Sequence, residues 1–412
     1  MAVQLRYNVR LYPTPGQRQA LARAFGCARV VFNDGLRARQ AAREQGLPYI
    51  GDGDLSKRVI TEAKKSPERS WLGEVSAVVL QQALADLNTA CRNFFASLSG
   101  KRKGPKVAAP RFRSKRDNRQ AIRFTKNARF AITPGGELRL PKIGDVAVRW
   151  SRALPAEPSS VTVVKDAAGR YFASFVVEVT EKPLPRAAPE AGIDLGLGHF
   201  AVLSDERKIG FPRFLRRAEK KLKRLQRALA RKAKGSNNRA KARLKVARQY
   251  AKVADARREF HHRESTKLIR ENQAIYVEDL AVDGLARTRL AKSVHDAGWS
   301  AFVGMLEYKA RLYGRTFHRI DRWFPSSKLC SACGAVAESM PLNVRSWTCP
   351  CGAVHDRDVN AAKNILAAGR AERLNASHES GRDGARRSGG GQVRPPHQVA
   401  QPVEAGSLRG AA

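Results

Sequence analysis

Two closely spaced pairs of cysteines constrain the fold of this chain more than any other feature. They follow the pattern C-x2-C-x15-C-x1-C, and a glycine, Gly334 or Gly352, directly follows each pair. Two close pairs can bring four thiolates to one tetrahedral Zn²⁺, and the glycines permit the tight turns that such a site needs. The short second pair departs from the commoner C-x2-C spacing. The four candidate ligands are Cys330, Cys333, Cys349 and Cys351.

The protein itself would supply all four ligands, so we expect a closed, structural zinc site. The alternative, four unrelated buried cysteines, does not account for the paired spacing. The other two cysteines, Cys27 and Cys91, stand alone and are expected to be buried apolar residues. The N-terminal sequence lacks the charged start and apolar core of a signal peptide. We therefore predict an intracellular, cytoplasmic protein without a disulfide framework.

The charge of the chain indicates what it binds. The formal net charge is +40, from 77 Lys and Arg against 37 Asp and Glu. Such a charge repels itself unless a polyanion neutralises it, so nucleic acid is the expected partner. A membrane-surface protein is the rival, but no run approaches 18 apolar residues, and no membrane partner is expected. A length of 412 residues, 42% of them hydrophobic, suits two or three packed domains.

The N-terminal half changes from helix to strand patterns along the chain. A strand is predicted over 3–12 and mainly helix over 17–96, and the segments "ELRLPKIGDVAVRW", "SSVTVVKD" and "RYFASFVVEVT" are predicted to be strands. A proline-rich linker, 181–190, follows.

The second half contains a very basic stretch, 213–258, with 19 Lys or Arg against two acids. A stripe of leucines and a break at "GSNN" favour a basic helical hairpin there. The Gly-, Arg- and Pro-rich end of the chain predicts a disordered tail over 371–412.

Three acids border apolar segments of the second half. Asp194 lies in "GIDLGLG", Glu278 ends the apolar run "AIYVE", and Asp358 opens the helical pattern "DVNAAKNIL". Each has an ordinary explanation by itself, as a turn former, a strand-end ion pair and a helix cap respectively. Together, in a strongly basic chain, they favour a Mg²⁺ site for phosphodiester cleavage, because ions that hold the attacking and leaving oxygens need a few shared carboxylates.

A second aspartate, Asp356, stands two residues before Asp358 in "HDRD". Apolar residues recur at helical spacing after Asp358, so the helix is predicted to begin there and to fix that carboxylate in its first turn. Asp356 lies in the loop that leaves the cysteine segment. It is predicted to pair with a basic neighbour such as Arg357 or to cap the helix.

These segments resemble the signature blocks of the TnpB family, which transposons encode and which is related to the compact type V CRISPR effectors. The blocks are "GIDLGLGHFAVLSD", "YVEDL", "WFPSSKLCSACG" and "HDRDVNAAKNIL", and the N-terminal "YPTPGQRQALARAFGCARVVFN" is also similar. The resemblance covers nearly the whole chain and is most specific in its last half. It implies an RNA-guided DNA endonuclease in a prokaryotic cytoplasm, associated with the nucleoid when bound to DNA.

The resemblance also implies the architecture. An α+β N-terminal half, a wedge β-barrel from 1–13 and 121–185 with an inserted helical recognition lobe, 14–120, would precede an RNase H-like (RuvC) α/β nuclease domain. That domain would span 191–370 and would contain an inserted zinc ribbon, 326–353.

Carried over position by position, Asp194, Glu278 and Asp358 match the catalytic triad of the family, and the four cysteines match its zinc ribbon. The implied cofactors are one structural Zn²⁺ and two catalytic Mg²⁺. The implied partners are a guide RNA from the 3′ end of the transposon and target DNA beside a short adjacent motif. The protein is expected to be a monomer in its complex with RNA.

Candidate nucleic-acid contacts come from two regions. The recognition lobe and barrel would read the adjacent motif, although an ordinary surface role for their polar residues is slightly favoured, and the basic hairpin would contact RNA phosphates. The residues are Gln81, Gln82 and Thr125 for the first region and Lys220, Lys221, Lys223 and Arg224 for the second. Two alternatives remain: a cleavage-inactive RNA-guided DNA-binding regulator, and a transposase-type strand-transfer enzyme.

Overall fold

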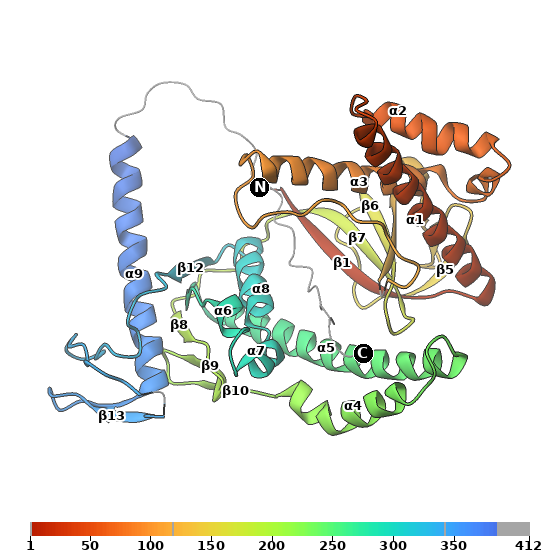
Figure 1. The fold of residues 1–412 in the computed structure, drawn as a ribbon. Helices are drawn as coiled ribbons and strands as arrows, with labels where there is room; N and C mark the ends of the chain where they lie inside the picture. The colour runs from red at the N-terminus through yellow and green to blue at the C-terminus, as the bar shows by residue number, and fades with distance from the viewer. Residues whose placement is uncertain (1, 118, 342, 385–412) are drawn as a thin grey trace. The chain divides into compact units, whose positions relative to one another are not determined.

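The computed structural model describes residues 2–117, 119–341 and 343–384. The chain divides into two compact units, the first ending at Thr180 and the second beginning at Glu181. Each unit combines a β-sheet with helices (Figure 1). The division falls at the start of the proline-rich segment, where the sequence predicts a linker.

The first unit contains a seven-stranded sheet in the order β2-β6-β7-β1-β5-β4-β3, with antiparallel neighbours throughout. β1 lies inside the sheet and pairs with β7 from Ala2↔Thr180 to Leu11↔Tyr171. In the described residues β2 and β3 are the two ends of the strand order, so hydrogen bonds between strands do not close this sheet into a complete barrel. The strands are β1 (Ala2–Tyr12), β2 (Gln120–Thr125), β3 (Ala131–Ile132), β4 (Leu138–Leu140), β5 (Gly144–Arg149), β6 (Ser160–Lys165) and β7 (Tyr171–Thr180).

The helices of the first unit come between β1 and β2 in the chain. α1 begins with a capping box, in which the Thr14 hydroxyl accepts a hydrogen bond from the Gln17 amide and Gln17 Oε1 accepts one from the Thr14 amide. Short π-helical and 3₁₀ turns follow: η1 (Lys57–Glu62), η2 (Ala63–Lys65) and η3 (Ser70–Glu74). α3 packs on α1 and on β2. The helices are α1 (Pro15–Glu44), α2 (Asp52–Ser56) and α3 (Ala77–Leu98), and a further turn, η4, covers Lys126–Ala128.

The segment "ELRLPKIGDVAVRW", predicted as strand, forms two strands, β4 and β5, joined by a turn. Lys142 adopts a left-handed φ of 66° and Gly144 one of 91°, and the Ile143 amide donates a hydrogen bond to the Leu140 carbonyl. Pro141 has no amide hydrogen to donate and Gly144 adopts positive φ without strain, so both residues favour this turn over a continuous strand.

The second unit is built on a five-stranded sheet in the order β10-β9-β8-β11-β12. β11 is parallel to both β8 and β12, whereas β9 is antiparallel to β8 and β10 to β9. Residues 274–277 of β11 are fully buried, as expected for a parallel strand covered on both faces. The strands are β8 (Glu190–Asp194), β9 (His199–Leu203), β10 (Lys208–Gly210), β11 (Ala274–Glu278) and β12 (Thr316–Ile320).

Different helices cover the two faces of this sheet. α9 packs across β8, β9, β11 and β12, where Tyr276, Ile320 and Ile365 form a small core. The other face carries a larger core that includes Phe200, Phe260 of α5 and Phe302 of α8. The helices are α4 (Phe214–Ala230), α5 (Asn237–Glu271), α6 (Val282–Leu285), α7 (Ala291–Ala297), α8 (Trp299–Leu312) and α9 (Arg357–Gly384).

The predicted basic hairpin is confirmed: α4 and α5 pack against each other, with the turn at Gly235 between them. The predicted start of the disordered tail is wrong, because α9 continues past residue 371 to Gly384 (Figure 1). Residues 371–374, Ala-Glu-Arg-Leu, all favour helix, and Glu372 accepts a hydrogen bond from the Asp321 amide and contacts His318. Residues 385–412 of the predicted tail lie outside the described residues. In the part of the chain that the structure describes, none of the helices has the length and apolar character to cross a membrane.

Candidate active site

The three acids singled out from the sequence lie at one edge of the second sheet. β8 and β11 are parallel neighbours with Ile193 opposite Val277, so the residues that follow, Asp194 and Glu278, end the two strands side by side. Asp358 lies in the first turn of α9, which packs on β8. Two strand ends and one helix start therefore bring together residues that are far apart in the chain.

The pKa of Asp194 reflects the charges of the other two acids. Burial, and then the negative charges of Asp358 and Glu278, raise the pKa of Asp194 to about 7. Burial and the neighbouring Asp279 raise the pKa of Glu278 above its usual value. Burial and nearby negative charges favour the protonated form of a carboxyl group, and a cation that approaches favours the charged form. The site is therefore short of positive charge, although the chain as a whole is strongly basic.

The two aspartates of "HDRD" have different surroundings. Asp356 Oδ1 accepts hydrogen bonds from the amides of Asp358 (3.0 Å) and Val359 (3.1 Å), and Asp356 Oδ2 pairs with Lys208 Nζ at 2.6 Å. These contacts lower the pKa of Asp356 despite its partial burial. Asp356 thus caps α9, as one of the two sequence interpretations predicted, but its basic partner is Lys208 rather than Arg357.

Asp358 has one carboxylate oxygen, Oδ1, 3.3 Å from Arg345 Nη1, and its side chain is 21% exposed. Among the described residues, the backbone amides of this turn donate to Asp356 and none donates to the Asp358 carboxylate. Its carboxylate therefore remains available to a ligand at the sheet edge, whereas that of Asp356 is engaged in holding the helix.

The four cysteines form a tight cluster, and all their sulfur atoms lie within 4.8 Å of one another. Cys330 Sγ is 3.8 Å from Cys351 Sγ, and Cys333 Sγ is 3.6 Å from Cys349 Sγ. Four sulfurs at the usual Zn–S distance of about 2.3 Å from a tetrahedral centre would be roughly 3.8 Å apart. The cluster could therefore hold a metal ion of this kind.

The backbone around each cysteine pair forms a turn that ends at a glycine. Gly334 donates its amide hydrogen to the Cys330 carbonyl and Gly352 donates to the Cys349 carbonyl, each at 2.9 Å. Both glycines have positive φ, 78° and 86°, which a residue with a side chain adopts only with strain. The one-residue spacing of the second pair shortens its turn: the Gly352 amide bonds three residues back, whereas the Gly334 amide bonds four residues back.

The short hairpin of β13 (Ser346–Thr348) and β14 (Val354–Asp356) joins the cysteine cluster to α9. His355 of β14 has Nε2 3.1 Å from Cys330 Sγ, and its ring centroid lies 4.9 Å from that of Trp347 with the rings tilted by 39°. Residues 326–356, which contain the four cysteines and this hairpin, form the cysteine ribbon. The ribbon ends directly at the helix that carries Asp358.

In the described residues, the cysteine cluster is the one group of three or more potential metal ligands as tight as this. The three acids share an edge without closing around a single point. Sequence reasoning found the acids and cysteines but missed the residues that hold them in place, which are Lys208, Arg345, Asn360 and Asn364.

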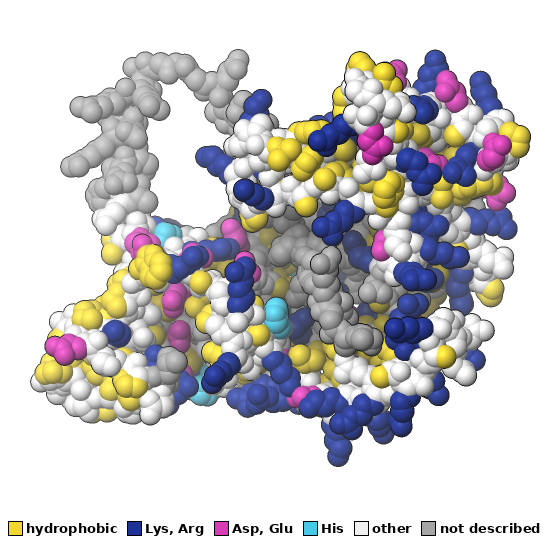
Figure 2. Space-filling model, in the orientation of Figure 1, with side chains coloured by type: hydrophobic (Ala, Val, Ile, Leu, Met, Phe, Trp, Pro, Cys, Tyr) yellow, Lys and Arg dark blue, Asp and Glu magenta, His cyan; other side chains and the backbone are white. Residues whose placement is uncertain are grey.

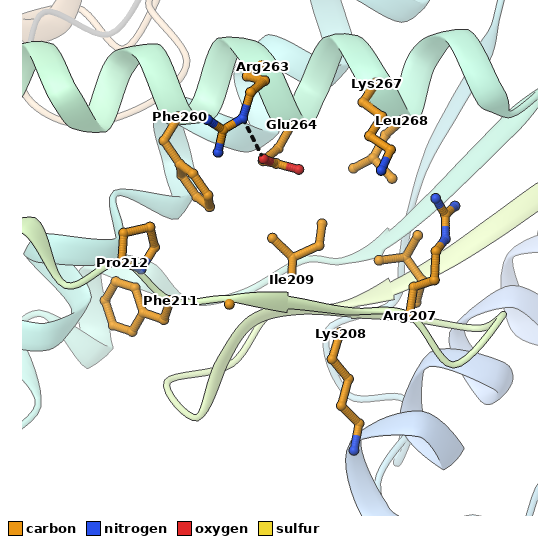
Figure 3. A pocket seen from close by; sticks show the side chains of 12 residues that line it. Arg207, Lys208, Ile209, Phe211, Pro212, Phe260, Arg263, Glu264, Lys267 and Leu268 are labelled. Carbon is orange, nitrogen blue, oxygen red and sulfur yellow. Dashed lines mark hydrogen bonds and ion pairs between the residues drawn. The ribbon is translucent and has the colours of Figure 1, made fainter.

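A pocket of about 640 Å³ lies between β10 and α5, with Ile209, Phe211 and Phe260 among its apolar lining (Figure 3). Lys208 belongs to the same strand but extends from its opposite face, toward α9. Strand β10 therefore separates the pocket from the cap of α9.

The candidate nucleic-acid contacts lie on both units. Gln81 is exposed and Gln82 half-buried on α3, and Thr125 ends β2, the strand on which α3 packs. In the second unit, Lys and Arg side chains gather densely over α4 and α5 (Figure 2). Lys220, Lys221, Lys223 and Arg224 are all exposed there. Of these, Lys223 forms an ion pair with Glu219 at 3.0 Å.

Three family profiles match the chain. Residues 174–289 match the OrfB_IS605 family, described as "Probable transposase", residues 299–365 match the "Cas12f1-like, TNB domain", and residues 1–47 match the "Helix-turn-helix domain" of OrfB_IS605 proteins. The last of these covers β1 and α1, a strand followed by one long helix.

Relatives match over most of the chain. A protein of Streptomyces pristinaespiralis named "Putative RNA-guided DNA endonuclease" is 46% identical over 374 residues, which are 89% of this chain and 90% of the relative. InsQ of Escherichia coli K12, of the same description, is 31% identical over 89% of this chain and 92% of its own. A solved structure of the Cas12f1-sgRNA-target DNA complex covers 89% of this chain and 99% of its own with a TM-score of 0.54 at 12% identity.

The class of protein that these features define has a mixed α/β fold like that of Cas12f1, with a cysteine ribbon inserted beside an acidic sheet edge. Within this class, the identity and coverage of the relatives show that the chain belongs to the TnpB family.

Proposed function

We propose that this protein is an RNA-guided DNA endonuclease encoded by a transposable element, and that it cleaves target DNA by hydrolysis of a phosphodiester bond. The observation that carries the proposal is the meeting of Asp194, Glu278 and Asp358 at one sheet edge in a member of the TnpB family. All three acids of the expected triad are present. That favours a cleaving enzyme over a DNA-binding regulator that has lost cleavage.

The acidic edge suits divalent cations. Oxygen ligands from carboxylates are those that Mg²⁺ prefers, and the raised pKa of Asp194 reflects like charges that a cation would offset. Because the three carboxylates do not close around one point, two ions that share them fit the arrangement better than a single caged ion. Mg²⁺ bound there would stabilise the attacking and leaving oxygens of the phosphodiester.

The chain's own residues would contribute position and charge. Asp194 and Glu278 are held by the ends of paired, buried strands, and Asp358 is held by the first turn of α9. The raised pKa of Asp194 favours its protonated form. In the active enzyme, with a cation bound, Asp194 would lose this proton. Arg345 beside Asp358 balances part of the remaining negative charge.

The domain assignments remain part of the proposal. The second unit would be a RuvC-like nuclease domain of the RNase H-like type. This is supported by the three parallel strands β8, β11 and β12, by the antiparallel pairs β8–β9 and β9–β10 that extend the sheet on the β8 side, and by acids on β8, β11 and α9. The sheet of the first unit would be the wedge. Its helices, inserted between β1 and β2, would be the recognition lobe, with Gln81, Gln82 and Thr125 near the adjacent motif of the target.

The cysteine cluster would hold one structural Zn²⁺. The sulfur spacings and the two glycine turns support this ion, and four protein ligands leave no open position for a reactant. Metal analysis of purified protein should find one zinc per chain. Cys349→Ser should lose the zinc and lower the thermal stability of the nuclease domain, since a structural zinc contributes folding free energy directly.

Cys91→Ser is the matched control, because Cys91 is a buried thiol of the first unit and is not one of the four cysteines of the cluster. It should keep one zinc per chain. Wild-type protein without zinc, or Cys349→Ser with unchanged zinc content, would contradict the assignment.

The guided-nuclease proposal is tested by purifying the protein from cells that express its transposon and sequencing the bound RNA. A plasmid library that carries the target matching that RNA beside a randomised flank is then incubated with the complex and Mg²⁺. We expect one flank to be enriched among cleaved plasmids. Asp194→Ala should bind the same RNA and cut nothing. RNA and target binding without cleavage by the wild type would instead indicate the regulator, and joined strands would indicate a transposase.

The same preparation tests the basic hairpin, which we propose contacts RNA phosphates. Replacing Lys220, Lys221 and Arg224 with alanine should reduce the retained RNA and flatten the slope of log K against log salt by about 2, at about 0.7 for each neutralised phosphate of a single strand. The control removes the same charge from exposed residues of the first unit, Lys57, Arg58 and Lys101. Equal effects of the two triple variants would place the RNA contact outside the hairpin.

A further inference from the structure

Two asparagines of α9 bind the cysteine ribbon through their side chains. Asn360 Nδ2 donates a hydrogen bond to the Leu329 carbonyl at 2.7 Å, and Asn360 Oδ1 accepts one from the Ser331 amide at 2.9 Å. Asn364, one turn further along α9, donates to the carbonyls of Ser326 at 2.8 Å and Leu329 at 2.6 Å. The two side chains thus make four hydrogen bonds to the backbone of residues 326–331.

Both asparagines are almost fully buried, with exposures of 1% and 3%. A buried amide costs free energy unless it is hydrogen-bonded, and asparagine is a poor helix former. Both positions lie inside the helix, so neither residue serves as a cap. Their side chains instead form hydrogen bonds to one short segment, which leads directly into Cys330.

Together with the covalent link between the ribbon and the start of α9, these contacts attach the ribbon to the helix at both of its ends. The chain leaves the ribbon at Asp356 and continues into α9, whereas it enters the ribbon at Ser326, which Asn364 holds. Without the asparagines, the entering segment would lose these side-chain bonds to the helix.

The position of the ribbon decides what surrounds Asp358. From the ribbon, Arg345 places Nη1 3.3 Å from Asp358 Oδ1, and the Arg345 carbonyl accepts a hydrogen bond of 2.8 Å from the Arg357 amide at the start of α9. Asn360 lies only two residues after Asp358. A shift of the ribbon would therefore move both the charge beside Asp358 and the first turn that carries it.

We propose that Asn360 and Asn364 are positioning residues, which fix the metal-binding ribbon to α9 and so hold Asp358 in its catalytic position. The catalytic part of this inference rests on the proposed function. The docking part does not, because it concerns only the attachment of the ribbon to the helix.

The test is the double variant Asn360→Ala/Asn364→Ala. We expect it to keep one zinc per chain, since neither residue touches a sulfur. Trypsin should cut it faster after Lys328, because the adjacent Leu329 carbonyl is no longer held. For guided cleavage we expect kcat to fall by at least about tenfold, since a displacement of about 1 Å can cost on the order of a hundredfold, with KM for target DNA changed by less than about twofold.

The matched control is Asn272→Ala. Asn272 is equally buried, 3% exposed, and its side-chain amide donates to the Leu268 carbonyl at the end of α5. The substitution removes a buried amide of the same unit without touching the ribbon. The rate of tryptic cleavage after Lys328 and kcat should therefore both stay near wild type. If the double variant does not fold, the single variant Asn364→Ala, which removes two of the four bonds, is judged by the same criteria.

Faster tryptic release of the ribbon with unchanged kcat would overturn the positioning role. Tryptic cutting like that of Asn272→Ala would overturn the docking itself. A wild-type protein that cuts no target would refute the proposed function, and the tryptic comparison would still decide whether the asparagines dock the ribbon.

Discussion

We expect Asp358→Ala to abolish cleavage of a guided DNA target while RNA binding and target binding persist. Asp358 is the carboxylate of "HDRD" that lies beside the ends of β8 and β11, and its charge is the first among those that raise the pKa of Asp194. Removing it takes a ligand from the acidic edge but no cap from α9. The loss should therefore appear in cleavage and not in thermal stability. Both are measured on one preparation, with the same plasmid target and Mg²⁺.

Asp356→Ala is the matched comparison, because it removes an aspartate two residues away. It deletes the cap of α9 and the ion pair with Lys208. Loss of a helix cap typically costs about 0.5–2 kcal/mol, so Tm should fall by a few degrees while measurable cleavage remains. If Asp356→Ala were inactive and Asp358→Ala cut the target, the assignment would be wrong by two residues.

The features that could be predicted from the sequence are those that local spacing determines. The cysteine pairs with their following glycines predicted a cluster, and the sulfurs do meet. Apolar runs that end in Asp194 and Glu278 predicted acids at strand ends, and the parallel pairing of β8 with β11 places those ends side by side. The helical spacing after Asp358 separated the acid of the first turn from the acid of the cap.

The features that were missed depend on contacts between residues far apart in the chain. Lys208 stands 148 positions before Asp356, and no local pattern joins a lysine on an edge strand to that helix. Asn360 and Asn364 read as ordinary polar residues of a helix, because their partners lie about 30 positions earlier in a loop without regular structure. The tail was predicted to begin too early for a similar reason: Glu372 is held by contacts to β12 and the residue after it, which composition does not reveal.

The second large effect is expected from Gly192→Ala, in the strand that carries Asp194. A Cβ atom at Gly192 would overlap the carbonyl oxygen of Ala362 and lie 2.5 Å from the amide nitrogen of Leu366. Both atoms belong to the backbone of α9, which cannot rotate away as a flexible side chain can. The helix must therefore move off β8. Overpacking of this kind typically costs about 1–3 kcal/mol, or several degrees in Tm.

The same displacement should affect catalysis, because α9 carries Asp358 and β8 carries Asp194. A shift of about 1 Å between catalytic groups can cost on the order of a hundredfold in rate, so cleavage should fall by more than the loss of stability alone would cause. Gly198→Ala is the control: it lies in the same "GIDLGLG" motif, is exposed, and has no atom within 4 Å of the added Cβ. Thermal melts and cleavage rates at a temperature where both variants are folded give the comparison. If Gly192→Ala has the same Tm and cleavage rate as Gly198→Ala, the close packing of α9 on β8 is not what holds Asp194 and Asp358 together.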